Sequence, residues 1–348
     1  MSFSNILIYW YLKIKRDLPW RKTKDPYLVW LSEIMLQQTR VSQGMSYYLA
    51  FSEVFPTVKD LANAEESKVL KMWQGLGYYS RARNLHFTAK YVSEELNGIF
   101  PSTYKDLIKL KGIGDYTASA IASICFNEPT AVVDGNVYRV LARYFQIETP
   151  INSTKGIKDF KSLAQSLLDN DQPGVYNQAI MDFGALQCKP QNPDCQNCPI
   201  NSGCLAFEKK LVKELPVKEK KLKIKKRYFN YIVFISKDKK TIFEQRLGKG
   251  IWQGLYQFPL VETDSEVHLD ELTSSKDFQI LVPFNATIRL SNEISIVHKL
   301  SHQHLFTKFW IINTQNSSSI PISWDKIESF PVPVLIANFL KEFLPKLN

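Results

Sequence analysis

The sequence predicts a mainly α-helical N-terminal region followed by a smaller α+β C-terminal domain. Up to about Phe207, apolar residues recur at spacings of three and four and the runs stop at prolines, which is typical of successive amphipathic helices. After residue 228 the pattern changes to short runs rich in β-branched and aromatic residues, separated by turn residues. With 348 residues, the chain is long enough for two or three domains. We place the boundaries at 1–207, 208–227 for a basic linker, and 228–348.

The first expected helix lies at the N-terminus. Phe3, Leu7, Trp10 and Ile14 are at helical spacing, and the basic residues follow this apolar run, whereas in a signal peptide they come first. No segment approaches the length needed to span a bilayer. We therefore expect a cytoplasmic protein without membrane association, and one associated with the nucleoid if its source is bacterial.

A second helix carries a candidate catalytic acid, Glu33. The pair Asp25–Pro26 predicts its start, because proline is favoured in the first helical turn, and the apolar pattern continues to about Arg40. Trp30 and Leu36 lie about one turn to either side of Glu33. Apolar neighbours disfavour a charged carboxylate, so we expect the pKa of Glu33 to be raised and the group to be protonated near neutral pH.

Two glycines, Gly112 and Gly114, separate two further expected helices, residues 102–109 and 116–124. Glycines on both sides of one aliphatic residue allow a sharp turn that presents backbone amides at the start of a helix, where an anion is favoured. A Gly-x-Gly sequence is also common as a plain link between helices. The pattern predicts a hairpin that can grip a phosphate.

Asp134 follows the apolar run 131–133 and is expected to cap a helix from Gly135 to about Arg143. The cap amides and the helix dipole favour its ionised form, although capping alone also explains an Asp here. A neutral Glu33 and an ionised Asp134 together form the acid pair that glycosidic cleavage needs: one protonates the leaving group, and the other stabilises a developing sugar cation. The pair therefore predicts acid-assisted glycosidic cleavage.

Four cysteines lie within residues 188–204 with the spacing C-x6-C-x2-C-x5-C, namely Cys188, Cys195, Cys198 and Cys204. Four thiolates in one loop are typical of an iron–sulfur cluster, and we expect a [4Fe-4S] cluster. A structural zinc site is the alternative, although zinc ribbons usually have two C-x2-C pairs. Disulfides are less consistent with so long a chain, whose fifth cysteine, Cys125, lies in an apolar run.

The net charge is +10 and the pI is about 9.1, which suggests a polyanionic partner such as nucleic acid. Much of the excess lies in the basic linker, where ten Lys or Arg residues face three acids. Such a run either contacts DNA or keeps a linker solvated and extended.

In the C-terminal domain we expect strands, loops and a closing helix. The strands are expected at 228–235, 241–246, 255–260, 286–290 and 308–312, with loops at 263–277 and 315–319 and a helix at 332–344. No cluster of glutamates able to hold Mg²⁺ occurs between residues 240 and 348.

The hairpin, the segment Val132–Val137 that follows it 20 residues later, and the cysteine loop occur in the same order as in the helix-hairpin-helix DNA glycosylase superfamily, which residues 1–205 resemble. Within it, Leu18–Arg21, Trp30–Val41 and Gly75–Leu85 are similar to the MutY family of adenine DNA glycosylases. Residues 228–348 resemble that family's C-terminal domain, which has the Nudix-hydrolase fold, most clearly over Trp252–Pro259.

The resemblance implies a base-excision repair enzyme that removes adenine mispaired with 8-oxoguanine or guanine in double-stranded DNA, and we expect it to act as a monomer. Glu33 would protonate the purine, and Asp134 would stabilise the sugar cation. The resemblance also implies roles for other residues. Within the site, Tyr116 would pack beside Asp134, Asn136 would form hydrogen bonds, and the adenine pocket would be lined by Trp20, Arg21 and Leu36. The residues implied to contact the rest of the DNA are wedges in the base stack (Gln38, Tyr78), phosphate-binding residues (Gly112, Gly114) and readers of the oxidised base (Ser301, His302). Leu300 replaces the family's commoner Phe next to Ser301.

Three other interpretations stay open. An endonuclease III-like enzyme needs a lysine near the hairpin that forms a Schiff base, but Gly114–Ser119 contains none and has Tyr116 at the corresponding position. We therefore expect a monofunctional glycosylase. A thymine or uracil mismatch glycosylase of the same fold is disfavoured by the 228–348 domain. A DNA-binding module with an iron–sulfur cluster and no activity would make Glu33 and Asp134 incidental.

Overall fold

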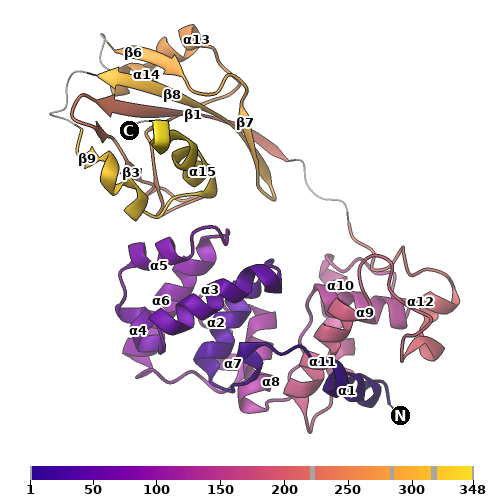
Figure 1. The fold of residues 1–348 in the computed structure, drawn as a ribbon. Coiled ribbons are helices and arrows are strands. Elements are labelled where there is room, and N and C mark those ends of the chain that lie inside the picture. The colour runs from indigo at the N-terminus through magenta and orange to yellow at the C-terminus, as the bar shows by residue number, and fades with distance from the viewer. Residues whose placement is uncertain (1, 220–223, 283–285, 315–319, 347–348) are drawn as a thin grey trace. The chain divides into compact units, whose positions relative to one another are not determined.

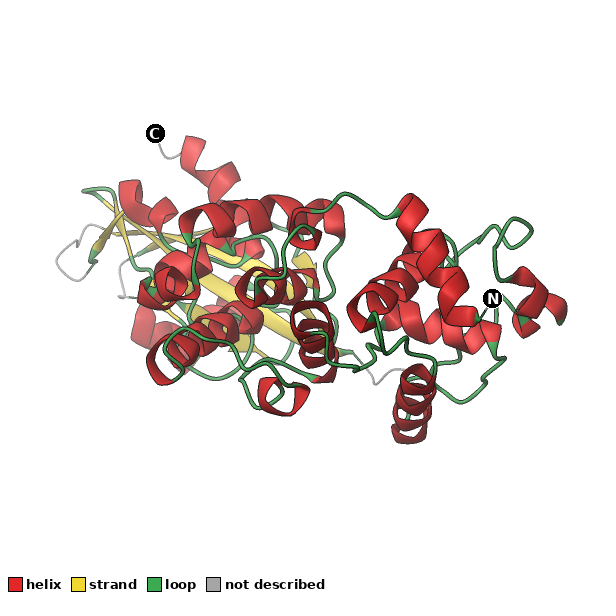
Figure 2. Cartoon of the chain, turned by 90° about the horizontal axis from the view of Figure 1, so that it is seen from below, coloured by secondary structure: helices red, strands yellow, loops and turns green. Residues whose placement is uncertain are grey.

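The computed structural model describes residues 2–219, 224–282, 286–314 and 320–346 (Figure 1). The chain forms two compact units: a helical unit, residues 1–63 and 84–220, and a sheet unit, residues 64–83 and 221–348. Within the described ranges, strands occur only from Lys225 onward. Figure 2 shows the strands in yellow among the red helices. Over the same ranges, no helix is both long and apolar enough to cross a membrane.

The helical unit is built from short helices joined by turns. They are α1 (Phe3–Ile14), α2 (Pro26–Leu36), α3 (Val41–Val54), α4 (Val58–Asn63), α7 (Tyr104–Leu107), α8 (Asp115–Phe126), α9 (Gly135–Tyr144), α10 (Thr154–Ser166), α11 (Pro173–Leu186) and α12 (Leu205–Glu208), with 3-10 turns at Pro19–Arg21 and Asn201–Gly203. α6 (Ser80–Glu95) begins within the range of the sheet unit and continues in the helical unit. The mainly helical N-terminal region is therefore as the sequence predicts.

α1, α9 and α11 share one apolar core with the cysteine loop. Leu7 of α1 and Phe183 of α11 are fully buried in this core, and the rings of Trp10 and Phe183 meet edge to face at 4.8 Å. The side chains of Cys188, Cys198 and Cys204 pack against the same core. The N-terminal helix and the cysteine loop thus belong to one packed layer, although they are far apart in the sequence.

α2 is buried over most of its surface, so it lacks the exposed polar face of an amphipathic helix. Asp25 caps its first turn by accepting a hydrogen bond from the backbone N–H of Tyr27 at 2.8 Å. The helix ends at Leu36 and not near Arg40 as we expected, since Gln38 adopts a left-handed conformation with φ of 55°. A left-handed residue cannot continue a right-handed helix.

Part of the basic segment 208–227 is packed. Leu215 is buried in the core of the helical unit, and the backbone N–H of Ile151 donates to the carbonyl of Val217 at 3.0 Å. The first strand begins at Lys225, so the end of this segment pairs within a sheet. Apolar residues such as Leu215 occur between the basic ones, and their burial explains how so basic a segment still packs.

The sheet unit contains a mixed five-stranded sheet and two short ribbons. Its strands are β1 (Lys225–Ser236), β2 (Lys240–Thr241), β3 (Glu244–Gln245), β4 (Tyr256–Gln257), β5 (Leu260–Thr263), β6 (Thr287–Leu290), β7 (Ile296–Lys299), β8 (Gln303–Thr314) and β9 (Ile322–Ser323). The main sheet runs in the order β5-β1-β8-β6, and β7 also pairs with β8. β1 and β8 are parallel, with Tyr231 opposite Phe309, and the other pairs are antiparallel.

Helices cover both faces of this sheet. On one face, Phe309 stacks on Phe339 of α15 (Val334–Phe343), with ring centroids 3.9 Å apart. On the other face, Ile232 and Trp310 pack with buried residues of α13 (Leu269–Thr273) and α14 (Lys276–Leu281). Successive residues of β1 and β8 therefore face opposite layers, as the period of a strand requires. Figure 1 shows α15 lying against the sheet.

The sequence predictions for the C-terminal domain are correct for the longest elements and wrong for several short ones. The predicted run 263–277 is not a loop, because it contains α13 and the start of α14. β7 and β9 were not expected, and each is only two to four residues long. The run 241–246 is split between two ribbons. The predicted loop 315–319 lies outside the described residues, while the closing helix is present.

Candidate active site and cysteine pocket

A cleft in the helical unit brings together most of the predicted catalytic residues. It has a volume of ≈ 680 Å³, and its walls include Glu33, Tyr116, Asp134 and Asn136. These residues come from α2, α8 and the start of α9, which are separated by about 80 and 20 residues in the sequence. The two carboxyl groups therefore share one solvent-connected space.

Glu33 is almost fully buried within α2, with 9% of its surface exposed. The hydroxyl of Tyr116 donates a hydrogen bond to its Oε2 at 2.7 Å. Burial is the main cause that raises the pKa of Glu33 to about 7. The nearby charge of Asp134 also raises it, whereas the Tyr116 hydrogen bond and Arg21 lower it. The carboxyl is therefore poised to donate a proton near neutral pH, as the sequence predicts.

Asp134 caps α9. Its Oδ1 accepts from the backbone N–H groups of Asn136 at 2.9 Å and Val137 at 2.8 Å, and its Oδ2 accepts from the Asn136 side-chain amide at 2.7 Å. We expected the pKa of Asp134 to be kept low, but burial raises it and outweighs the three hydrogen bonds that lower it. Both carboxyls thus lie in poorly solvated surroundings, and they differ in that only Asp134 accepts several N–H groups.

Two groups that the sequence analysis missed hold Asn136 in place. Arg139, one turn later on α9, donates to Asn136 Oδ1 at 2.8 Å and to the backbone carbonyl of Gly184 on α11 at 2.6 Å. A Cβ on Gly184 would lie 2.6 Å from the Cβ of Asn136, so the two helices approach closely only because this residue is glycine. Arg139 also donates to the carbonyl of Cys188 at 2.8 Å, which links the acid pair to the cysteine loop.

Trp20, Arg21 and Leu36, which the resemblance places in the base pocket, also line the cleft. Trp20 is only 6% exposed and packs edge to face on Tyr48, with ring centroids 5.0 Å apart, so one side of the ring is core and another faces the cleft. A Cβ on Gly44 would come within 2.8 Å of the end of Leu36. The absent side chain leaves room for Leu36 at the cleft wall.

Arg21 is fixed by a buried carboxylate. Its guanidinium donates two hydrogen bonds to Asp182, at 2.5 and 2.7 Å, and Arg16 also binds this carboxylate, which has no exposed surface. Three charges in this arrangement leave a net positive charge at the cleft wall. The sequence carried no local signal for the group, because Asp182 lies more than 160 residues from Arg21.

Gln178 is a further polar residue in the cleft that the sequence analysis left without a role. The Tyr11 hydroxyl donates to its Oε1 at 2.5 Å, so the amide NH2 is the end of the side chain that can donate to a ligand in the cleft. A donor at this position can pair with a ring nitrogen of a purine.

The two hairpin glycines differ in backbone conformation and in the space around them. Gly112 has a φ of 82°, and an added Cβ would lie 2.7 Å from the Cβ of Asn84. Gly114 caps α8 with a φ of −94°, and an added Cβ would meet nothing within 4 Å. Gly112 is thus needed to form the turn, whereas the open space beside Gly114 allows a ligand to approach the helix start.

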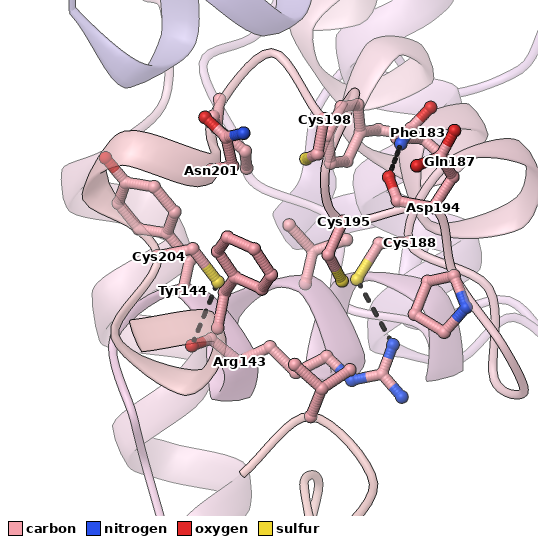
Figure 3. A pocket seen from close by; sticks show the side chains of 15 residues that line it. Arg143, Tyr144, Phe183, Gln187, Cys188, Asp194, Cys195, Cys198, Asn201 and Cys204 are labelled. Atoms are coloured by element: carbon pink, nitrogen blue, oxygen red, sulfur yellow. Dashed lines mark hydrogen bonds between the residues drawn. The ribbon is translucent and has the colours of Figure 1, made fainter. Parts of the chain in front are cut away.

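The four predicted cluster ligands line one pocket, and their side chains enter it from the end of α11, the loop 195–198 and the start of α12 (Figure 3). Burial raises the pKa of the Cys198 thiol to about 12. Arg143 Nη1 donates to the Cys188 sulfur at 3.4 Å and to the carbonyl of Lys189 at 2.8 Å. The described residues contain no group of three or more His, Cys, Asp or Glu side chains placed to hold a single metal ion.

The two predicted wedge residues share an unusual backbone. Gln38 has a φ of 55° and Tyr78 a φ of 47°, and both side chains are exposed, Tyr78 by 47%. A positive φ is uncommon for residues other than glycine and is often found at functional sites.

A pocket within the sheet unit brings Tyr78 together with the predicted base-reading pair, Ser301 and His302. Trp252, from the segment that most resembles the Nudix-like domain of the family, lines the same pocket. The hydroxyl of Ser301 lies 3.3 Å from His302 Nδ1, on the turn between β7 and β8. Residues that are over 200 positions apart in the sequence thus form one wall.

Comparisons with known proteins agree with this architecture. Residues 31–165 match the HhH-GPD superfamily base excision DNA repair protein model, and residues 230–342 match the NUDIX domain model. An adenine DNA glycosylase of Buchnera aphidicola (subsp. Baizongia pistaciae) is 35% identical over 90% of this chain and 86% of its own length. The human adenine DNA glycosylase is 46% identical over 60% of this chain and 40% of its own length.

Solved structures share the fold of the N-terminal region. A thermostable thymine-DNA glycosylase is 30% identical with a TM-score of 0.56, and it covers 60% of this chain and 95% of the other. An endonuclease III–DNA complex, at 20% identity and a TM-score of 0.52, covers 60% of this chain and 94% of the other, and agrees in fold.

The fold, the cleft with its two carboxyls and these matches define a base-excision DNA glycosylase of the helix-hairpin-helix superfamily, with a Nudix-like C-terminal domain. Within that superfamily, the chain belongs to the adenine DNA glycosylase family.

Proposed function

We propose that this glycosylase removes adenine paired with 8-oxoguanine or guanine in double-stranded DNA. The observation that carries the proposal is that Glu33 and Asp134, from separate helices, line one cleft of ≈ 680 Å³, which has room for a purine base and has polar groups at its wall. The names of the relatives, which are adenine DNA glycosylases, support the choice of base.

In this proposal, Glu33 protonates the departing adenine. Its pKa of about 7 keeps a large fraction protonated at neutral pH, and the Tyr116 hydroxyl at 2.7 Å orients the carboxyl. Protonation lets the base leave as a neutral molecule while the C1′–N9 bond breaks. Asp134, whose charge is stabilised by three N–H groups, balances the positive charge that develops on the sugar. The side-chain amide of Asn136 holds the Asp134 carboxylate in this position.

We further propose that the four cysteines hold a [4Fe-4S] cluster. Cys188, Cys195, Cys198 and Cys204 line a common pocket with apolar walls, and the thiolate donor set suits iron and sulfide. The guanidinium of Arg143, 3.4 Å from the Cys188 sulfur, would offset the negative charge of bound thiolates. When bound, such a cluster supplies a cross-link that ties the loop 188–204 together.

The sheet unit would read the base opposite adenine. Ser301 and His302 line one pocket with Tyr78, which supports the assignment of the first two to the oxidised base. Tyr78 and Gln38, each exposed and at a positive φ, would be the wedge residues that fill the stack when adenine is flipped out. A Nudix-type pyrophosphatase is disfavoured, since the sequence between residues 240 and 348 has no glutamate cluster for Mg²⁺.

The enzyme would be monofunctional. Cleavage of the DNA strand by a bifunctional glycosylase starts from a Schiff base with an amine. The corresponding hairpin position holds Tyr116, and the residues that line the described cleft include arginines but no lysine. Borohydride reduction is therefore expected to trap no stable covalent complex with DNA.

The decisive experiment uses duplexes with adenine, thymine or uracil opposite guanine or 8-oxoguanine. Base release is followed under single-turnover conditions, and the strands are analysed with and without alkali. Release of adenine opposite both partners, with strand breaks only after alkali, is the expected result. Release of thymine or uracil without adenine would overturn the proposal in favour of a pyrimidine mismatch glycosylase, and binding without any release would indicate a DNA-binding module.

A further inference from the structure

A chain of hydrogen bonds leads from the sheet to the loop that carries Ser301. On β1, the guanidinium of Arg227 donates to both carboxylate oxygens of Glu262, at 2.6 and 2.5 Å, and to Oε1 of Gln303 at 3.3 Å. Gln303 Nε2 lies 3.1 Å from His302 Nε2, and His302 Nδ1 lies 3.3 Å from the Ser301 hydroxyl. The chain runs from a buried residue, Gln303, to two exposed ones.

The direction of each hydrogen bond follows from its donors. Arginine can only donate, so the oxygen of the Gln303 amide must face Arg227. The amide NH2 of Gln303 then faces His302, and because it can only donate, His302 Nε2 must be an acceptor without a proton. A neutral imidazole with a bare Nε2 carries its proton on Nδ1.

The consequence falls on Ser301. When His302 Nδ1–H donates to the Ser301 oxygen, the hydroxyl proton is not needed for this bond and is available for a ligand. With the opposite tautomer, the hydroxyl would donate to Nδ1 and only its lone pairs would face the pocket. One buried amide therefore sets whether the loop presents a donor.

8-oxoguanine differs from guanine by a carbonyl oxygen at C8 and a proton on N7. We propose that Gln303, oriented by Arg227, is a positioning residue that holds His302 as the neutral Nδ1–H tautomer, so that Ser301 donates its proton to the C8 oxygen of 8-oxoguanine. This inference rests on the proposed function, since the base itself is assigned there. Guanine carries only a hydrogen at C8, so a donor placed at that position discriminates between the two partners of adenine.

The tautomer can be measured without any reaction. In full-length protein labelled with ¹⁵N, long-range ¹H–¹⁵N spectra distinguish protonated from bare ring nitrogens, and the signals of His302 are identified by comparison with His302→Asn. At a pH where histidine is neutral, the expected result is a bare Nε2 and a protonated Nδ1. A protonated Nε2 in the wild-type protein would overturn the proposal.

Gln303→Met removes the donor while keeping the length of the side chain, and Gln279→Met, at an exposed position on α14, is the matched control. In Gln303→Met the His302 signals should move toward the Nε2–H form that predominates in free histidine. The ratio of single-turnover rates with 8-oxoguanine and with guanine opposite adenine should fall by roughly 2- to 10-fold, the effect of about one hydrogen bond. The control should change neither readout.

An unchanged ratio in a Gln303→Met protein whose tautomer has reversed would also overturn the proposal. If the wild-type protein shows the Nδ1–H tautomer but releases no adenine from either duplex, the proposed function fails and the role in discrimination fails with it, while the tautomer itself stands. The spectra and the rates thus separate the two failures.

Discussion

Two carboxyl groups in one cleft have different chemical surroundings at the scale of single residues. Glu33 accepts one hydroxyl hydrogen bond, and burial, aided by the nearby Asp134 charge, outweighs the effects of this bond and of the Arg21 charge, so its pKa rises to about 7. Asp134 is also buried, but three N–H groups point at its oxygens. The difference in hydrogen bonding, more than a difference in exposure, supports the proposed acid role of Glu33 and the proposed anion role of Asp134.

Replacing Glu33 with Gln keeps the size of the side chain and removes the proton that it can donate. We expect single-turnover adenine release to fall by roughly 10²- to 10⁴-fold, the usual contribution of a general acid, while affinity for the duplex changes little. Glu53→Gln, at an exposed position on α3, is the matched control. A Glu33→Gln enzyme with near wild-type rates would rule out the acid role.

The pH dependence tests the same group in the unmodified protein. Glu33 is protonated below its pKa of about 7, so the rate of base release should decline as the pH rises through 7. The sign for stability is the same: the folded state binds this proton more tightly than the unfolded state, whose pKa is near 4.5, so the free energy of unfolding falls as the pH rises between the two values. Thermal melting of wild type and Glu33→Gln across the range from pH 4.5 to pH 7 measures this contribution.

The sequence predicted the surroundings of Glu33 better than those of Asp134, for a physical reason. Trp30 and Leu36 flank Glu33 on the same helix, so local spacing was enough to infer a raised pKa. The burial of Asp134 comes from packing against other segments, which no local pattern encodes. The same limit hid Asp182, whose partner Arg21 lies more than 160 residues away.

At the scale of elements, the two glycines of the hairpin before α8 differ: Gly112 is needed for folding, and Gly114 is proposed to be needed for DNA binding. Gly112→Ala should lower the free energy of unfolding by about 1–2 kcal/mol, because it places a Cβ at positive φ and against Asn84. Gly114→Ala has an ordinary φ and open space, so its melting temperature should change little. If the helix start binds phosphate, Gly114→Ala should nevertheless weaken DNA binding.

Calorimetry on both variants, with fluorescence-anisotropy titration of an undamaged duplex, provides the measurements. Equal affinity of wild type and Gly114→Ala for the duplex would mean that the hairpin is only a link between helices.

Long elements were predictable because their side chains repeat. α1, α8, the cap of α9, β1 and α15 all follow from spacing and from capping residues in the sequence, whereas the helix expected at 102–109 is only the four-residue α7. The short elements were not: β7 and β9 have too few residues for a period to be visible, and α13 and α14 lie in a run that is mostly polar. The end of α2 depended on one backbone dihedral, that of Gln38, which its residue type does not specify.

For the whole molecule, the cysteine pocket gives a prediction that does not depend on activity. The purified protein should be coloured, with about four iron atoms per chain, if the pocket holds a [4Fe-4S] cluster. Cys198→Ser should reduce both iron content and melting temperature, since the loop shares its core with α1 and α9. Cys125→Ser, outside the pocket, is the control.

Stoichiometric zinc without visible absorption would contradict the cluster. Full colour in Cys198→Ser would instead remove this residue from the set of ligands.

The sheet unit is discontinuous in the sequence. Its early part, residues 64–83, makes hydrogen bonds with residues more than 160 positions later: the Arg83 guanidinium donates to the carbonyl of Gln253 at 2.6 Å, and the Tyr79 hydroxyl to that of Val332 at 3.2 Å. During synthesis, the early part leaves the ribosome long before its partners exist, so these bonds close only when translation is nearly finished. Formation of these hydrogen bonds is therefore tied to the last stage of translation.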